Sequence, residues 1–364
     1  MENIVFRKNI LDIEPYIPGK PIEEVERELG LKNIVKLASN ENPWGPSPKA
    51  VSAILNRVDN IHLYPDGSAY ELIQVLSEQL SFSKENIILG NGSDELIRMI
   101  AETFLYPEDE VIIPEPTFSA YEFATKLMGG KIVKVPTEDY KLNLNGMLEK
   151  INKKTKLIFI CNPNNPTGKI VSKEELEDFL NNIPEQIVVI LDEAYNEYVE
   201  SSDYKSGLEY LRHRKNLIVL RTFSKIYGLA GLRVGYGIAD KQLIDLINRV
   251  REPFNVNLLA QVAAVASLRD KDYLNKCKQL NSLNKQMLYS NLKHLSLDYV
   301  PTEANFILID LKRDAQVIYK EMLKKGVIIR PCTSFGLPNH IRVTIGKEEE
   351  NLIFINALAQ VLKK

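Results

Sequence analysis

The sequence predicts an α/β protein with a large domain, in which helices cover both faces of a mostly parallel sheet, and a smaller α+β domain. The chain has 364 residues, 45% of them hydrophobic and 26% charged, which is typical of a globular protein with about two domains. Between residues 87 and 237, short apolar runs alternate with helical patterns, as expected for parallel strands joined by helices. A mainly helical stretch, 240–293, precedes a second alternation of strands and helices.

The first 30 residues are expected to form an arm rather than a domain. Prolines and a glycine recur from Pro15 to Pro21, and a short charged helix is predicted from Ile22 to Leu29. The large domain is predicted at residues 31–265 and the small C-terminal domain at residues 266–364.

Five apolar runs of the large domain are predicted to be strands, namely IILG, VIIP, LIFICNP, IVVILDEAY and NLIVLRTFSK. Ligands of open parallel sheets bind beyond the carboxyl ends of the strands. Functional residues are therefore expected in the turns that follow these runs.

The small domain is predicted from a second set of runs. FILIDL, VIIRPC and HIRVTIG are predicted strands, with helices at 315–325 and from Glu348 to Leu362. This order of elements is that of a small α+β unit.

Composition argues against several classes of protein. A formal net charge of -2 without a dominant basic face gives no reason to expect nucleic acid, and no apolar run approaches the roughly 20 residues needed to cross a bilayer. The first residues lack the apolar core of a signal peptide, so a cytoplasmic location is expected.

Cysteine and histidine spacing predicts no metal site. Cys161, Cys277 and Cys332 are far apart and form no CxxC, the four histidines form no HExxH, and no GxSxG hydrolase motif occurs. Any catalysis is therefore expected to depend on an organic cofactor.

Lys225 lies in the run VLRTFSKIYGLAGLRVGYG, just beyond a predicted strand, with Arg233 eight residues later among glycines. A lysine attacks a carbonyl only when it is unprotonated, and a nearby arginine can lower its pKa enough for this. The alternative is an ordinary solvated lysine. Lys225 alone does not establish a covalent role, and the support for that role comes from motifs elsewhere in the chain.

The segment GNGSDELIRMI places a glycine-rich turn between a predicted strand and a helix, with Ser93 or Asp94 near the helix cap. The free N–H groups and dipole of such a helix start suit a phosphate. Taken alone, the segment is better explained as an ordinary capped helix, with Ser93 and Asp94 satisfying its first turn. The segment is not GxGxxG, which disfavours a dinucleotide.

Two further strand ends carry polar residues. Asn165 follows LIFIC in a loop rigidified by prolines, where it could donate to a ligand oxygen, although Asn and Pro also simply make turns. Asp192 ends the most apolar run, and a carboxylate there needs a cationic or N–H partner. Structural pairing is the usual explanation, but beside Lys225 a protonated pyridine nitrogen is the better candidate. Tyr195 follows three residues later.

Several motifs in order, GNGSDE, PTFSAY, CNPNNPTG, DEAY, TFSK and GLAGLR, resemble the fold type I, class I/II family of pyridoxal-phosphate aminotransferases. The resemblance covers essentially the whole chain. It implies that Lys225 forms the Schiff base with pyridoxal 5'-phosphate and later shuttles a proton, and that Asp192 pairs with the pyridinium nitrogen, which keeps the ring an electron sink.

The resemblance implies roles for other residues as well. Asn165 and Tyr195 would hydrogen-bond the 3-oxygen of the ring, and Phe118 would stack on the ring face. The phosphate would be held by Ser93, Asp94, Thr222, Ser224 and Arg233. Tyr64 resembles the residue that reaches the cofactor phosphate of a partner subunit, which implies a homodimer.

Within this family, PYIPGKPIEEVERELG, KLASNENPWGPSP and YPDGS look more narrowly like the histidinol-phosphate aminotransferases. That branch would exchange the amino group between glutamate and imidazole-acetol phosphate, in either direction. It implies that Tyr16, Asn40, Arg330 and Arg342 bind substrate, with Arg342 taking a carboxylate by bidentate hydrogen bonds.

Three rival functions remain open from the sequence. A broad aromatic-amino-acid aminotransferase would share every cofactor residue, and a threonine-phosphate decarboxylase would bind a similar phosphate. A regulator that binds pyridoxal phosphate without turnover is disfavoured, because the chain keeps Lys225, Asp192 and Arg233 together.

Overall fold

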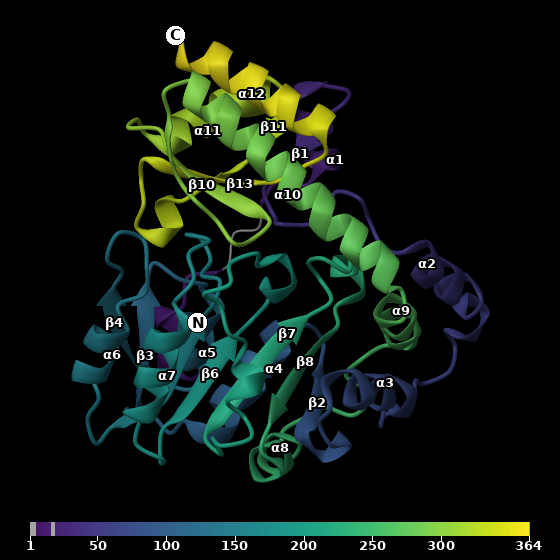
Figure 1. The fold of residues 1–364 in the computed structure, drawn as a ribbon, viewed down its shortest axis with the longest axis vertical. Coiled ribbons are helices and arrows are strands. Elements are labelled where there is room, and N and C mark those ends of the chain that lie inside the picture. Colours follow the sequence, from purple (N-terminus) through teal and green to yellow (C-terminus); the bar gives the residue numbers. More distant parts are fainter. Residues whose placement is uncertain (1–4, 16–18, 364) are drawn as a thin grey trace.

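The computed structural model describes residues 5–15 and 19–363. A seven-stranded sheet lies in the lower part of Figure 1 and a four-stranded sheet in the upper part. The long helix α10 (Lys271–His294) runs from the lower part to the upper part. The predicted α/β class is confirmed.

The seven-stranded sheet has the order β2-β8-β7-β6-β5-β3-β4. From β7 to β4 in this order, each strand pairs in parallel with the next. Strand β8 runs antiparallel to both of its neighbours. The strands are β2 (Ile87–Gly90), β3 (Glu110–Glu115), β4 (Lys131–Pro136), β5 (Thr155–Cys161), β6 (Val188–Asp192), β7 (Leu217–Thr222) and β8 (Gly235–Ala239). The mostly parallel sheet predicted from the five runs is therefore confirmed, whereas β4 and β8 were not predicted.

Helices cover both faces of this sheet because alternate strand residues point to opposite sides. In β7, Ile218 and Leu220 join the core under α4, α5 and α8, whereas Leu217 and Val219 join the core under α6 and α7. Each such buried side chain contributes about 1.5–3 kcal/mol. The helices are α4 (Ser93–Phe104), α5 (Ala120–Leu127), α6 (Leu144–Glu149), α7 (Lys173–Asn181) and α8 (Lys241–Ile247).

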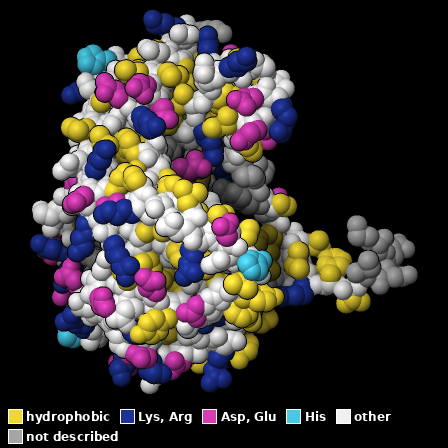
Figure 2. Space-filling model, turned by 90° about the vertical axis from the view of Figure 1, so that its right-hand side faces the viewer, with side chains coloured by type: hydrophobic (Ala, Val, Ile, Leu, Met, Phe, Trp, Pro, Cys, Tyr) yellow, Lys and Arg dark blue, Asp and Glu magenta, His cyan; other side chains and the backbone are white. Residues whose placement is uncertain are grey.

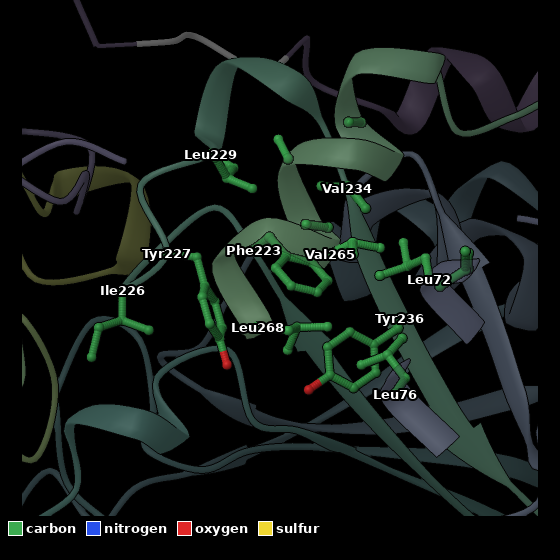
Figure 3. Close-up of a cluster of buried hydrophobic side chains, with 14 of the residues drawn as sticks. Leu72, Leu76, Phe223, Ile226, Tyr227, Leu229, Val234, Tyr236, Val265 and Leu268 are labelled. Atoms are coloured by element: carbon green, nitrogen blue, oxygen red, sulfur yellow. The ribbon is translucent and has the colours of Figure 1, made fainter. Parts of the chain in front are cut away.

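A further buried cluster lies beside β8 and joins segments that are distant in sequence. Leu72 and Leu76 of α3 (Tyr70–Leu80) and Leu268 of α9 (Leu258–Leu268) pack with Tyr236 and Phe223 (Figure 3). This cluster anchors the turn that follows β7, which carries Lys225.

The four-stranded sheet is antiparallel, with the order β12-β13-β10-β9. Its strands are β9 (Asp298–Val300), β10 (Phe306–Asp310), β12 (Arg330–Pro331) and β13 (His340–Thr344), and it packs against α10, α11 (Ala315–Lys324) and α12 (Glu348–Leu362). The terminal helix has the predicted bounds. The short strand β1 (Val35–Lys36) pairs in parallel with β11 (Val327–Ile328). The domain boundaries at 30 and 265 stay a prediction.

The N-terminal region contains the predicted helix α1 (Ile22–Leu29), and α2 (Pro48–Leu55) follows β1. Before them, a 3₁₀ turn at Lys8–Asp12 lies against α5, where Asn9 Nδ2 donates to the Lys126 carbonyl at 2.6 Å. Within residues 5–15 and 19–363, no helix combines the length and the apolar character that a membrane span requires.

Candidate functional site

A cleft opens at the carboxyl edge of the seven-stranded sheet, with about 890 Å³ of space that includes open solvent at its mouth. It collects side chains from the ends of β2, β3, β5, β6 and β7 and from β12 and β13. Thirteen of the predicted site residues line it: Asn40, Ser93, Asp94, Phe118, Asn165, Asp192, Tyr195, Thr222, Ser224, Lys225, Arg233, Arg330 and Arg342.

Tyr64, the other predicted site residue in the described part of the chain, does not line the cleft. Tyr64 is 83% exposed, and its ring stacks on Phe254 with centroids 4.7 Å apart. Tyr16 lies outside the described residues.

Lys225 is held between two buried anchors, Phe223 and Ile226, and its side chain reaches into the cleft. Its Nζ donates to the Ser39 carbonyl at 3.3 Å and lies 5.7 Å from the centroid of the Tyr195 ring. Removal from water lowers the pKa of Lys225 to about 8, and Arg342 is the next largest cause. Arg233, the cation singled out from the sequence, contributes less. The amine is therefore poised to lose its proton near neutral pH.

Asp192 ends β6 with only 2% of its surface exposed. One carboxylate oxygen accepts a hydrogen bond from the Tyr121 hydroxyl at 2.7 Å, and the other accepts from the Ala194 N–H at 3.1 Å. Burial raises the pKa of Asp192 to about 6, while both hydrogen bonds act to lower it. Within residues 5–15 and 19–363 no cation forms an ion pair with Asp192, and such a buried carboxylate is suited to hold a cationic ligand atom.

The start of α4 faces the cleft and could bind an anion. Ser93 and Asp94 are the first two residues of the helix, next to the N-cap as the sequence predicts, and the N-cap itself is Gly92 with φ 78° and no side-chain cap. A Cβ at Gly92 would lie 2.6 Å from Arg233 Nη2, so glycine lets the guanidinium approach. The first-turn N–H groups of this twelve-residue helix thus remain available to a ligand.

Arg233 links the other residues at the site where an anion could bind. Its Nη2 donates to Asp94 at 3.2 Å and its Nη1 to Ser224 Oγ at 3.4 Å. Thr222 Oγ1 accepts from the Ser224 N–H at 3.1 Å. The ends of β2 and β7 therefore present N–H groups, hydroxyls and a guanidinium to one corner of the cleft.

The remaining polar residues contact one another across the cleft. Asn165, 5% exposed, accepts a hydrogen bond from Arg342 at 2.5 Å, and Asn40 Nδ2 donates to the Tyr195 hydroxyl at 3.0 Å. Burial raises the pKa of Tyr195, so its hydroxyl stays protonated. Phe118 is partly buried beside these groups.

Arg330 and Arg342 enter from the four-stranded sheet, where they are register partners on β12 and β13. Arg342 is 7% exposed, and its Nη2 also donates to the Ala38 carbonyl at 2.8 Å. Two guanidinium groups on adjacent strands form a cationic wall that suits a carboxylate or a phosphate.

Sequence reasoning missed several residues that line the cleft or lie directly behind it. Cys161 lies directly opposite Asp192 in the register of β5 and β6, and Tyr121 contacts Asp192 from α5. Ser119 and Phe335 also line the cleft. Ser119 and Tyr121 belong to the same PTFSAY motif as Phe118, which was the available signal, whereas nothing in the sequence marks Phe335.

The geometry fits pyridoxal phosphate at each of its polar ends. The Gly92–Arg233 corner accommodates a phosphate, Asp192 offers a buried carboxylate for a ring nitrogen, and Lys225 offers an amine of lowered pKa for an aldehyde.

Comparison with known proteins agrees with this geometry. The family model described as aminotransferase class I and II matches residues 32–358. A histidinol-phosphate aminotransferase of Moorella thermoacetica is 54% identical over 98% of this chain and 92% of its own length, and one of Caldicellulosiruptor saccharolyticus is 47% identical over 98% and 100%.

A solved structure is also similar over its full length. The crystal structure of histidinol-phosphate aminotransferase from Sinorhizobium meliloti in complex with pyridoxal-5'-phosphate superposes with a TM-score of 0.91 at 27% identity, covering 100% of this chain and 99% of that one. The match of the family model to most of the chain and the identity to full-length relatives lead to one conclusion: the chain belongs to the aminotransferase class I and II family.

Proposed function

We propose that this chain is a pyridoxal-phosphate-dependent aminotransferase that interconverts L-histidinol phosphate and 2-oxoglutarate with imidazole-acetol phosphate and L-glutamate. The observation that carries the proposal is the convergence of Lys225, Asp192 and the paired arginines Arg330 and Arg342 on one cleft. The relatives named histidinol-phosphate aminotransferase, up to 54% identical over nearly the whole chain, support this choice of substrate.

Five residues are proposed to form the site of the cofactor phosphate: Ser93, Thr222, Ser224 and Arg233 as its ligands, and Asp94 as the partner of Arg233. Backbone N–H groups at the start of α4 and the Arg233 guanidinium would neutralise its charge. The Asp94 carboxylate is an acceptor and cannot donate to phosphate, so we assign it the orientation of Arg233, which it contacts at 3.2 Å.

The ring would lie between Asp192 and Lys225, with Phe118 against its face. Asp192 would hold the ring nitrogen in its protonated form, and Asn165 and Tyr195 would donate to the ring oxygen. When bound, pyridoxal phosphate supplies an electron sink for the pair of electrons left at the substrate α-carbon.

Lys225 would act twice in turnover. Its neutral amine would hold the cofactor through its aldehyde, and with substrate bound the same Nζ would take the proton from the substrate α-carbon. A pKa of about 8 lets Nζ accept and return this proton near neutral pH. Arg342 and Arg330 would hold the substrate anion, which is a carboxylate in glutamate and a phosphate in histidinol phosphate.

Substrate kinetics test the proposal. Purified holoenzyme is mixed with L-histidinol phosphate, L-phenylalanine or L-threonine phosphate, and kcat/KM is measured for each from the loss of the cofactor's visible absorbance. We expect L-histidinol phosphate to react with the highest kcat/KM. An order-of-magnitude preference for phenylalanine would indicate an aromatic aminotransferase instead, and release of CO₂ from threonine phosphate would indicate a decarboxylase.

We further propose a homodimer in which Tyr64 of each subunit reaches the cofactor phosphate of its partner. Apolar side chains are exposed from α2 to Tyr64, including Leu55, Ile61 and Leu63, and Phe254 supports the Tyr64 ring. The side that carries α2 and α3 faces the viewer in Figure 2, where hydrophobic side chains gather toward the lower right. Exposed apolar groups in this number favour burial against a second subunit.

Replacing Tyr64 by phenylalanine is expected to weaken binding of pyridoxal phosphate to the apoenzyme by about tenfold or more, because a hydrogen bond to a charged group is lost. Fluorescence titration of the apoenzyme measures the affinity, and sedimentation velocity is expected to report a dimer. Tyr106→Phe, at another exposed tyrosine, is the control. A monomer in sedimentation, or equal affinity in both variants, would argue against the shared site.

We also propose that the enzyme works in the cytoplasm. Cys161, Cys277 and Cys332 are all buried with free thiols, which fits a reducing compartment.

A further inference from the structure

Tyr121 is a buried residue whose hydroxyl points at Asp192. It is the second residue of α5, its side chain is 0% exposed, and its hydroxyl donates to Asp192 Oδ2 at 2.7 Å. We propose that Tyr121 is a positioning residue, which orients the Asp192 carboxylate and keeps it ionised so that it can hold the ring nitrogen of the cofactor. This inference rests on the proposed function, in which Asp192 meets that nitrogen.

The ring of Tyr121 is clamped, which fixes where its hydroxyl lies. It stacks on Phe159 of β5 with centroids 4.6 Å apart and planes at 11°, and it meets Phe118 edge to face at 5.7 Å and 88°. Such aromatic pairs contribute beyond the area they bury and prefer these geometries. The hydroxyl therefore approaches Asp192 from a fixed direction.

Two hydrogen-bond donors fix the orientation of the Asp192 carboxylate. Tyr121 occupies Oδ2 from α5, and the Ala194 N–H occupies Oδ1 from the turn after β6. Each carboxylate oxygen has a second lone pair that can accept another hydrogen bond. Since Asp192 lines the cleft, those remaining lone pairs are available to a donor bound there.

Electrostatics explain why a donor is needed at this place. Besides Tyr121, the titratable groups that interact with Asp192 are Cys161 of β5, Asp94 of α4, Tyr195 after β6 and Lys225 after β7. Burial raises the pKa of Asp192 and Asp94 raises it further, whereas the Tyr121 hydrogen bond opposes the change more than any other group. Burial also raises the pKa of Tyr121 well above its ordinary value, so the phenol remains a donor.

Ring stacking alone does not explain why residue 121 is a tyrosine rather than a phenylalanine. A phenylalanine at position 121 would make the same contacts with Phe159 and Phe118 and would leave Asp192 with one donor fewer. Tyr121→Phe therefore separates the packing role from the positioning role.

The test measures affinity of the apoenzyme for two ligands, pyridoxal phosphate and 1-deazapyridoxal phosphate, which has carbon in place of the ring nitrogen. Tyr121→Phe is expected to weaken binding of pyridoxal phosphate by about tenfold or more and to leave binding of the deaza analogue within about twofold. Tyr210→Phe is the control, since it removes another largely buried tyrosine hydroxyl, which donates to the Lys173 carbonyl away from the cleft. Equal losses for both ligands, or no loss for either, would overturn the proposal.

Coupling to Asp192 gives a second measurement. In the Asp192→Asn background, Tyr121→Phe is expected to have little further effect on affinity for pyridoxal phosphate, because Tyr121 acts through the carboxylate. Additive losses would overturn the inference. In the holoenzyme, kcat/KM should fall at low pH, and Tyr121→Phe should shift this fall to higher pH by about one unit.

These outcomes are distinguishable from failure of the proposed function. A wrong substrate assignment would change the kinetics with histidinol phosphate but would leave the two affinities and their coupling intact. A wild-type protein that does not bind pyridoxal phosphate would overturn the proposed function itself.

Discussion

Replacing Lys225 by alanine is expected to abolish transamination, with kcat/KM for histidinol phosphate lower by about 10⁴-fold or more, because both the covalent attachment and the proton carrier are lost. The variant should also lack the visible absorbance of a lysine-linked cofactor. Steady-state kinetics and an absorbance spectrum of the variant mixed with pyridoxal phosphate measure the two effects.

The fold should survive this change. Phe223 and Ile226, on either side of Lys225, are fully buried and keep the turn anchored. Lys278→Ala is a matched control, because Lys278 is also partly buried and donates to a backbone carbonyl, that of Val199, at 2.9 Å. An unchanged visible spectrum in Lys225→Ala would refute the assignment of the Schiff-base lysine.

The pH dependence of cofactor attachment follows from the same residue. With a pKa of about 8, half of the Lys225 amine is neutral at pH 8, whereas an ordinary lysine of pKa 10.5 would be neutral in about 0.3% of molecules. The rate at which apoenzyme gains visible absorbance should therefore rise with pH and level off above about pH 9. A rate that continues to rise beyond pH 10 would contradict the lowered pKa.

Three of the predicted site residues, Asn165, Asp192 and Lys225, stand at or just beyond the ends of apolar runs in the sequence. Asn165, Asp192 and Lys225 end up at one edge of the sheet because β5, β6 and β7 are parallel neighbours. Predicting that these three residues lie together requires only knowing which runs are strands and that the strands are parallel. Short buried runs bounded by turns carry both pieces of information.

Two strands of the seven-stranded sheet, β4 and β8, were missed for physical reasons. β4 is an edge strand in which Lys131 and Lys134 make exposed ion pairs, so its pattern is not that of a buried run. β8 contains Gly235 and Gly237, and glycine normally weakens a strand. At Gly235 a Cβ would lie 2.7 Å from the Ser93 backbone nitrogen, so close packing against α4 selects glycine there.

Side-chain partners could not be predicted from spacing. Tyr121 and Asp192 are 71 positions apart, and Arg342 and Asn165 are 177 apart. Which of these polar groups touch depends on rotamers and on how the four-stranded sheet faces the seven-stranded one. The resemblance to a family predicted which residues gather, and the structure adds which of them hold one another in place.

Replacing Asp192 by asparagine is expected to lower kcat/KM by about 100-fold or more, while making the apoenzyme more stable at neutral pH. Activity falls because an amide cannot balance a protonated ring nitrogen, and breaking a buried charge pair costs about 3–5 kcal/mol. Stability rises because wild type holds a carboxylate that is 2% exposed and whose pKa burial has raised to about 6. Steady-state kinetics and denaturant unfolding of the apoenzyme measure the two effects.

The sign of the stability change follows from the raised pKa. An acid whose pKa is higher in the folded protein than the ordinary 3.8 destabilises that protein progressively as pH rises from about 4 through about 6. The amide introduced by Asp192→Asn carries no charge at any pH, so the variant apoenzyme should exceed wild type in stability by up to about 3 kcal/mol at pH 8 and by about half as much at pH 5.

Asp270 provides a control of opposite sign. Its carboxylate accepts from Ser47 and Lys49, which lower its pKa, so Asp270→Asn should destabilise the apoenzyme at pH 8. A carboxylate that costs the apoenzyme stability at pH 8 is explained by a ligand that needs its charge. If Asp192→Asn were instead less stable than wild type at pH 8, the carboxylate would be a structural partner of Tyr121 and the Ala194 N–H rather than a site for the ring nitrogen.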